Sequence, residues 1–231
     1  MKLPPTVAVN LHDPALSEYW RKRAEQHVHD SYAGVPMSKF PEDLRVYEHL
    51  LWLDAPDTVI ELGTQWGGSA LWFRDRLAAM RAYGRIAREP TVISVDIAQS
   101  GPRRMLEECG NAAGIALVEG DLREPQVAER VASLIGVRCL VIEDSAHTHE
   151  TTRAALDNYA RFVPRGGFMV IEDGCVDDEH LRLPGWPRGV RPALDGWLQT
   201  PEGAEFKVRR DLELYGVTCH PSGFLQRRNG S

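Results

Sequence analysis

The stretch VIELGTQWGGS, from Val59 to Ser69, decides the fold. It starts as a short apolar run and ends in a turn that contains Gly63, Gly67 and Gly68. A buried strand that leads into such a turn and then into a helix is typical of nucleotide-binding α/β sheets, where backbone N–H groups approach a polar ligand. We therefore expect a cofactor site at this turn.

Two other apolar runs end in the same acidic tetrapeptide, VIED, at Val141–Asp144 and at Val170–Asp173. Open α/β sheets bind their ligands at the edge where the carboxyl ends of parallel strands meet. We expect Asp144, Glu172 and Asp173 to gather at this edge and to face the cofactor site. Such a pairing indicates an enzyme rather than a scaffold.

Short apolar or β-branched runs alternate with helical stretches along most of the chain. Their continuous hydrophobicity indicates strands buried on both faces, as in a parallel sheet covered by helices. We predict a doubly wound, Rossmann-like α/β fold, with a helix over Pro41–Trp52 before the first strand. The predicted strands are Val59–Ile60, Val92–Val95, Ile115–Val118, Cys139–Ile142 and Phe168–Ile171.

The two ends of the chain are expected to extend this unit. Residues 1–40 are predicted to be an N-terminal extension, and residues 41–231 the Rossmann-like domain. Asp13 is expected to cap a helix over Pro14–Asp30, whose aromatic and histidine side chains suit a pocket cover, a subunit contact or a plain solvated helix. The late runs, which predict an antiparallel hairpin at the sheet edge, are Phe206–Val208, Leu214–Thr218 and Phe224–Gln226.

Composition favours a globular protein with small-molecule partners. A chain of 231 residues with 43% hydrophobic content suits one large α/β domain. The net charge of -6 and the pI of about 5.8 argue against nucleic acid or an anionic membrane as partner. With no secretory leader and no apolar run of about 18 residues, we expect a cytoplasmic protein. The four cysteines form no C-x-x-C pair and are predicted to be reduced thiols.

The glycine-rich turn differs from two common nucleotide motifs. It is neither G-x-G-x-x-G nor followed by a P-loop lysine, so dinucleotides and nucleoside triphosphates are disfavoured. S-adenosylmethionine, with its sulfonium, amino group and ribose diol, requires acceptors at strand ends, and we predict that Glu61, Asp96 and Asp121 supply them. Asp96 or Asp121 taken alone is equally well explained as a helix cap or a turn residue. The turn residues predicted to contact the cofactor are Gly63, Thr64, Gln65, Gly67 and Ser69.

The acids at the later strand ends predict a metal site. Asp144, Glu172 and Asp173 form an all-oxygen set that favours Mg²⁺, with Mn²⁺ as a substitute, over zinc or iron. A non-haem iron site built on His147 and His149 is the weaker alternative. We predict His147 as the general base, because a divalent cation lowers the pKa of an acceptor hydroxyl enough for a neutral imidazole to remove the proton. His149 is expected to face solvent or to support its neighbour.

Four motifs resemble one known family: ELGTQWGGSA at 61–70, VISVDI at 92–97, VIEDSAHTHE at 141–150 and FVPRGGFMVIEDG at 162–174. They resemble the methyltransferase-like group of cephalosporin hydroxylases and rhamnosyl O-methyltransferases, over roughly residues 36–200. The group is similar in site layout to macrolide-sugar O-methyltransferases. The resemblance implies S-adenosylmethionine, Mg²⁺ and a homo-oligomer. It also places Asp144, Glu172 and Asp173 at the family's metal ligands and His147 at its proposed base.

We therefore predict an S-adenosylmethionine- and Mg²⁺-dependent O-methyltransferase of natural-product or antibiotic biosynthesis. Its acceptor is expected to be a hydroxyl of a vicinal diol, a sugar moiety or another natural product. Two alternatives are an oxygenase or hydroxylase component of antibiotic biosynthesis and a non-catalytic S-adenosylmethionine-binding protein. The segment Gly174–Trp197, rich in proline and aromatic residues, is expected to form a loop on the acceptor side.

Overall fold

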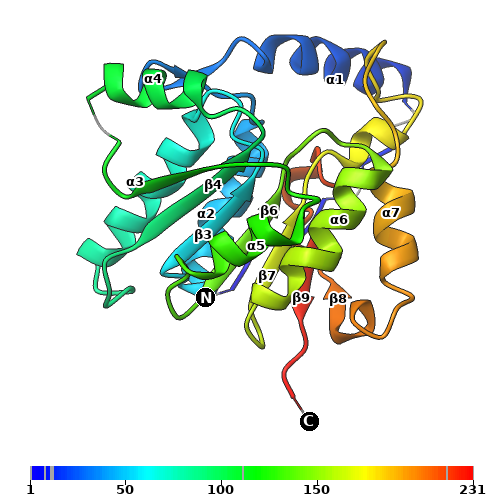
Figure 1. Ribbon diagram of the computed structural model, residues 1–231. Helices are drawn as coiled ribbons and strands as arrows, with labels where there is room; N and C mark the ends of the chain where they lie inside the picture. Colours follow the sequence, from blue (N-terminus) through cyan, green and yellow to red (C-terminus); the bar gives the residue numbers. More distant parts are fainter. Residues whose placement is uncertain (1, 8, 11–12, 111, 217, 231) are drawn as a thin grey trace.

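A seven-stranded sheet organises the described residues, which are 2–7, 9–10, 13–110, 112–216 and 218–230 of the computed structural model (Figure 1). The strand order is β5-β4-β3-β6-β7-β9-β8. The strands are β3 (Thr58–Leu62), β4 (Thr91–Asp96), β5 (Ile115–Glu119), β6 (Cys139–Glu143), β7 (Phe168–Ile171), β8 (Phe206–Val208) and β9 (Phe224–Arg227). A separate hairpin pairs β1 (Ser31–Tyr32) with β2 (Val35–Pro36).

Strands β3 to β7 run parallel, and the predicted doubly wound α/β fold is confirmed. The chain moves outward from β3 through β4 to β5, and then returns to the other side of β3 with β6. The order therefore reverses between β3 and β6, which is where sheets of this class bind ligands. Leu62 pairs with Glu143 in the register, so the two strands end side by side.

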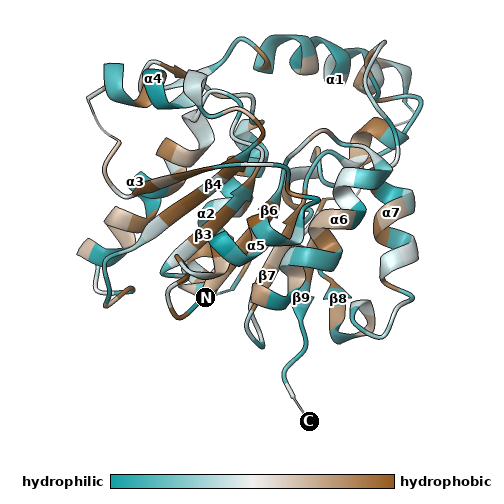
Figure 2. Cartoon of the chain, in the orientation of Figure 1, coloured by the Kyte–Doolittle hydropathy of each residue, from teal (hydrophilic) through white to brown (hydrophobic). Residues whose placement is uncertain are grey.

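Helices cover both faces of this sheet. Alternate strand residues divide the core, because Ile60 and Leu62 pack with residues of α5, α6 and α7, whereas Val59 packs with α2 and α3. Figure 2 shows the hydrophobic strands lying between helices whose outer faces are hydrophilic. The helices are α1 (Pro14–His27), α2 (Pro41–Asp54), α3 (Gly68–Ala82), α4 (Ser100–Glu108), α5 (Pro125–Ala132), α6 (His149–Tyr159) and α7 (Val190–Trp197).

No helix in the described ranges has the length and apolar character needed to cross a lipid bilayer. Short 3₁₀ turns fill the remaining connections. They are η1 (Ala160–Phe162), η2 (Gly174–Asp177), η3 (Gly203–Glu205), η4 (Arg210–Leu212) and η5 (Leu214–Gly216). The four cysteines are free thiols, as predicted.

The predicted antiparallel hairpin at the sheet edge is confirmed, but one of its expected strands does not form. Strand β9 lies between β7 and β8 and is antiparallel to both, so that β8 is the edge strand of the hairpin. The predicted strand over Leu214–Thr218 is wrong, because Leu214–Gly216 forms η5, with Tyr215 at a φ of 67°. Residue 217 lies outside the described residues. A left-handed residue interrupts the extended backbone that a strand requires.

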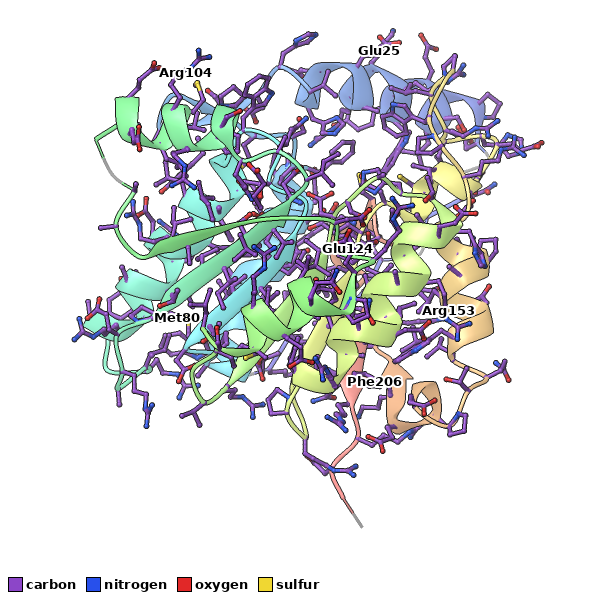
Figure 3. All side chains as sticks on the ribbon, in the orientation of Figure 1. Glu25, Met80, Arg104, Glu124, Arg153 and Phe206 are labelled. Carbon is purple, nitrogen blue, oxygen red and sulfur yellow. The ribbon has the colours of Figure 1, made fainter. Side chains whose placement is uncertain are left out.

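The N-terminal segment is fastened to the main core. Asp13 caps α1 by accepting the N–H groups of Ala15 and Leu16, as predicted, although the helix ends at His27 rather than at Asp30. Trp20 is 1% exposed and donates its indole N–H to the carbonyl of Leu181 at 3.2 Å. In Figure 3, Glu25 on α1 and Arg104 on α4 point away from the body of the molecule. The division near residue 40 stays a prediction.

We expect Trp20→Ala to lower the free energy of unfolding by about 3–5 kcal/mol, because it empties a packed position and removes the hydrogen bond to Leu181. Tyr19→Ala is the matched control on the same helix, since Tyr19 is 51% exposed, and should change the value by about 0.5 kcal/mol or less. Urea unfolding measures both. Equal midpoints for the two variants would show that α1 is not held by Trp20.

Candidate functional site

A cavity of about 830 Å³ lies beyond the carboxyl ends of β3, β4 and β6. This volume is in the upper part of the range of about 300–1,000 Å³ found for ligand pockets. Its walls come from the end of α1 with residues 36–39, the glycine-rich turn after β3, and the segments at the ends of β4, β5, β6 and β7. The end of α1 therefore contributes to the pocket cover that was one of the predicted alternatives.

Two glycines allow the chain to close around this cavity. Gly63 has a φ of +110°, and a Cβ there would lie 1.9 Å from the carbonyl oxygen of Asp144. A Cβ at Gly68 would lie 2.3 Å from the carbonyl oxygen of Pro36. Both contacts are with backbone atoms of this chain, so these glycines serve close backbone packing as well as the predicted approach to a ligand.

The cofactor end of the cavity is organised by Asp96. Its carboxylate accepts the N–H of Thr64 at 2.9 Å and that of Gln65 at 3.2 Å, which fixes the turn against the end of β4. Asp121 also lines the cavity, but its carboxylate is held by the guanidinium of Arg123, with contacts of 2.6 and 3.0 Å. The predicted cofactor residues that line the cavity are Gly63, Thr64, Gln65, Ser69, Asp96 and Asp121.

Glu61 and Gly67 were predicted to contact the cofactor but are absent from the described cavity wall. Glu61 is fully buried, and it accepts the Ser94 hydroxyl at 2.6 Å. Its Oε1 has no hydrogen-bond partner among the described residues. Burial raises the pKa of the Glu61 carboxyl, although Lys39 opposes this effect. A buried carboxylate oxygen that lacks a hydrogen-bond partner would suit a cationic ligand group nearby.

A cluster of three polar side chains forms the other end of the cavity. His147 Nε2 lies 3.8 Å from Asp144 Oδ1 and 3.2 Å from Asp173 Oδ2. All three line the cavity, and their side chains are between 21% and 27% exposed. His147 and Asp173 both have left-handed backbones, each with a φ of 54°. Strained residues of this kind gather at functional sites.

Lys39 is the main site residue that the sequence analysis missed. Its ammonium donates to Asp144 Oδ2 and to Glu172 Oε2, each at 2.5 Å. The other oxygen of Glu172 accepts the Tyr47 hydroxyl, also at 2.5 Å. The side chains of Lys39 and Glu172 are 3% and 2% exposed. Glu172 therefore lies behind the open cluster, with both oxygens engaged, rather than beside Asp173 at the cavity surface.

The carboxyl groups of Asp144 and Glu172 have pKa values that are shifted in opposite directions. Burial and the neighbouring Glu172 raise the pKa of the Asp144 carboxyl well above its usual value, in spite of Lys39. For Glu172, burial acts upward, but Lys39 and His220 outweigh it and lower the pKa. Asp144 therefore holds its proton more tightly than Glu172 does. A cation bound at Asp144 would favour the ionised form of this carboxyl.

His220 holds the backbone of Asp173 in place and is a second site residue that the sequence analysis did not predict. Its Nδ1 accepts the backbone N–H of Asp173 at 3.0 Å, which fixes the residue that follows Glu172. The Nε2 atom lies 3.7 Å from both Asp43 and Glu172. No short motif marks His220 or Lys39, because each reaches the site from a segment distant in sequence from the VIED runs.

The donor atoms fit a hard divalent cation on the open side of the site. Asp144, His147 and Asp173 each offer an atom within 4.8 Å of the others, and the two carboxylates face the cavity. Mg²⁺ is commonly bound by one or two carboxylates together with waters. Glu172 belongs to a separate group of possible ligands with Asp173 and His220, and its Oε2 accepts the Lys39 ammonium.

The remaining predicted residues are placed as follows. His149 is exposed at the start of α6, as expected. Of the segment Gly174–Trp197, Trp186 and Pro187 line the cavity, whereas η2 and α7 make its two ends helical. The expected loop is thus confined to the middle of that segment.

Comparisons with known proteins identify the family of the chain. The model of the family "Rhamnosyl O-methyltransferase/CmcI" matches residues 24–228. The rhamnosyl O-methyltransferase of Mycobacterium tuberculosis (strain H37Rv) is 28% identical over 203 residues, which are 85% of this chain and 78% of that protein. The enzyme of the same name from Mycobacterium leprae is 26% identical, over 86% and 83% of the two chains.

Solved structures show the same fold. A CmcI structure described as an Mg-SAM complex has a TM-score of 0.60 and 25% identity, and covers 86% of this chain and 76% of its own. An apo CmcI structure has a TM-score of 0.61 at 22% identity, over 99% and 91% of the two chains. The chain belongs to the rhamnosyl O-methyltransferase/CmcI family and is an S-adenosylmethionine-dependent O-methyltransferase.

Proposed function

We propose that the protein transfers a methyl group from S-adenosylmethionine to a hydroxyl of a small molecule, with a divalent cation, Mg²⁺ by preference, held at Asp144 and Asp173. The observation that carries this proposal is the single cavity that joins Asp96 and the glycine-rich turn to the Asp144–His147–Asp173 cluster. Both halves of the predicted site thus open into one space, as a direct transfer requires.

The cofactor end supports a nucleoside. Asp96 lies at the end of β4, where it can accept ribose hydroxyls while it holds the turn. Ile97, the next residue, lines the cavity and is 74% exposed, which provides an apolar surface for an adenine ring. Glu61 is buried, and its Oε1, which has no hydrogen-bond partner among the described residues, would suit the cationic groups of the cofactor.

The acidic end supports activation of a hydroxyl. When bound, a divalent cation would act as a Lewis acid that lowers the pKa of an acceptor hydroxyl. His147 lies at the acidic end of the cavity, where it can take the acceptor proton, and Asp173, 3.2 Å from Nε2, would stabilise the imidazolium. The acceptor oxygen can then attack the cofactor's methyl carbon in line, so that the C–O bond forms as the C–S bond breaks and S-adenosylhomocysteine leaves. The protein contributes chiefly orientation and exclusion of water.

The acceptor is proposed to be a vicinal diol, such as a sugar moiety of a natural product. Two adjacent oxygens suit a cation that is held by only two cavity-facing carboxylates. Trp186, Pro187, Met37 and His27 add a largely apolar wall on that side, which suits the body of a glycosylated metabolite. The rhamnosyl O-methyltransferase name of the mycobacterial relatives is consistent with a sugar acceptor.

An oxygenase is less well supported. A non-haem iron site takes two histidines and one carboxylate. Among the described residues, the open cluster combines one histidine with two carboxylates, and His149 is exposed outside it. A non-catalytic binding protein is disfavoured because His147 and both cavity-facing carboxylates are present.

We expect Asp144→Asn to reduce Mg²⁺-dependent methyl transfer by about a hundredfold or more, because it removes a charged ligand of the cation. Binding of S-adenosylmethionine, measured by calorimetry, should change little. Asp157→Asn is the control, since Asp157 lies on α6 in an exposed ion pair with Arg153. Mass spectrometry of a panel of hydroxylated metabolites would detect the methyl gain. Full activity in the variant, or in the presence of EDTA, would refute the metal requirement.

We expect His147→Gln to lower kcat by about 10²- to 10⁴-fold, the usual contribution of a general base. Affinity for S-adenosylmethionine should be retained, because the imidazole contacts the acidic cluster rather than the glycine-rich turn. His149→Gln, two residues away and exposed, should behave as wild type. A similar rate for both variants would remove His147 from the proton-transfer step.

A further inference from the structure

Lys39 connects the N-terminal segment to the predicted metal ligands. It lies between β2 and α2, and its ammonium is placed between Asp144 Oδ2 and Glu172 Oε2. The next residue, Phe40, packs against Trp20 with ring centroids 4.9 Å apart. The backbone that carries Lys39 is therefore anchored in the core, and the ammonium is a built part of the site.

This ammonium occupies the place that a metal ion would need in order to use all three predicted ligands. Asp144 and Glu172 supply two of the three carboxylates, and each directs one oxygen at Lys39. A second cation at these same oxygens would be repelled by the ammonium at short range in a poorly solvated region. The two cations therefore exclude each other between Asp144 and Glu172.

We propose that Lys39 is a built-in competitor of the divalent cation. The ammonium and the ion are alternative partners of Asp144 and Glu172, so the complete three-carboxylate site forms only when Lys39 withdraws. Until then, the cavity-facing donors of Asp144 and Asp173 remain open to the ion. This inference rests on the proposed metal-dependent function and adds the residue that sets the affinity of the site for the ion.

Withdrawal of Lys39 would also alter the wall of the cavity. Pro36, Met37, Ser38 and Lys39 all line it, and Pro36 packs against Gly68 at the start of α3. The position of this segment is thus coupled to the cation that the carboxylates hold. Binding of the ion and the shape of the acceptor side should change together.

Mn²⁺ binding tests the competition directly. We expect Lys39→Met, which keeps the length of the side chain and removes its charge, to bind Mn²⁺ about tenfold or more tightly than wild type, measured by electron paramagnetic resonance of free Mn²⁺. Lys207→Met, on the exposed edge strand β8, is the matched control and should leave the affinity unchanged. Unchanged or weaker Mn²⁺ binding by Lys39→Met, with a native near-UV circular dichroism spectrum, would overturn the proposal.

A second measurement uses wild-type protein and does not depend on the folding of a variant. The chain has four lysines, Lys2, Lys22, Lys39 and Lys207. Acetylation with an amine-reactive ester, quantified by mass spectrometry, should modify Lys22 and Lys207 regardless of the ion, and Lys39 faster once Mn²⁺ is saturating. An unchanged or slower reaction at Lys39 in saturating Mn²⁺ would contradict its withdrawal.

The outcomes separate the two proposals. If wild type binds Mn²⁺ and methylates its acceptor with Mg²⁺, but Lys39→Met binds Mn²⁺ no more tightly, only the competition fails. If neither protein binds Mn²⁺, the metal-dependent function fails and the competition fails with it.

Discussion

The close approach of β3 and β6 at Gly63 is the constraint on which the site depends. The N–H of Asp144 donates to the carbonyl of Leu62 at 2.8 Å, and its own carbonyl lies where a Cβ of residue 63 would be. The glycine-rich turn and Asp144, the last residue of the first VIED run, are therefore in direct contact. A larger residue at position 63 would separate the cofactor end of the cavity from the acidic end, although each could still form alone.

Electrostatic interactions hold the side chains in place at the acidic end of the cavity. Glu172 and Glu61 are buried, whereas Asp144 is partly exposed, and the Lys39 ammonium lies between Asp144 and Glu172. Burial opposes its charge, but the carboxylates outweigh this effect and raise the pKa of the ammonium well above its usual value. The acids and Lys39 thus depend on each other in the absence of an ion. An internal counter-ion of this kind permits the carboxylates to be prearranged for a metal without unfolding the strand ends.

Much of the fold could be predicted from the sequence, because the signals that specify it are local. Continuous apolar runs predict β3 to β7. The acidic residues at the ends of these runs, Asp96, Asp144 and Asp173, all line the cavity. Prediction failed where long-range packing decides the outcome. The apolar run Leu214–Thr218 predicts a strand, yet Leu214–Gly216 forms a 3₁₀ turn. Lys39 is an ordinary residue in sequence, and only the folding of residues 31–40 across the strand ends gives it a partner in Glu172.

The central claim is that one cavity holds an S-adenosyl nucleoside at the glycine-rich turn and a divalent cation at the neighbouring carboxylates. Diffraction from crystals grown with S-adenosylhomocysteine and Mn²⁺, recorded at the manganese absorption edge, tests it most directly. We predict an anomalous peak within coordination distance of the Asp144 and Asp173 carboxylates, with the nucleoside ribose at Asp96. Nucleoside density at the turn without a peak at these carboxylates, or a peak at a different set of ligands, would contradict it.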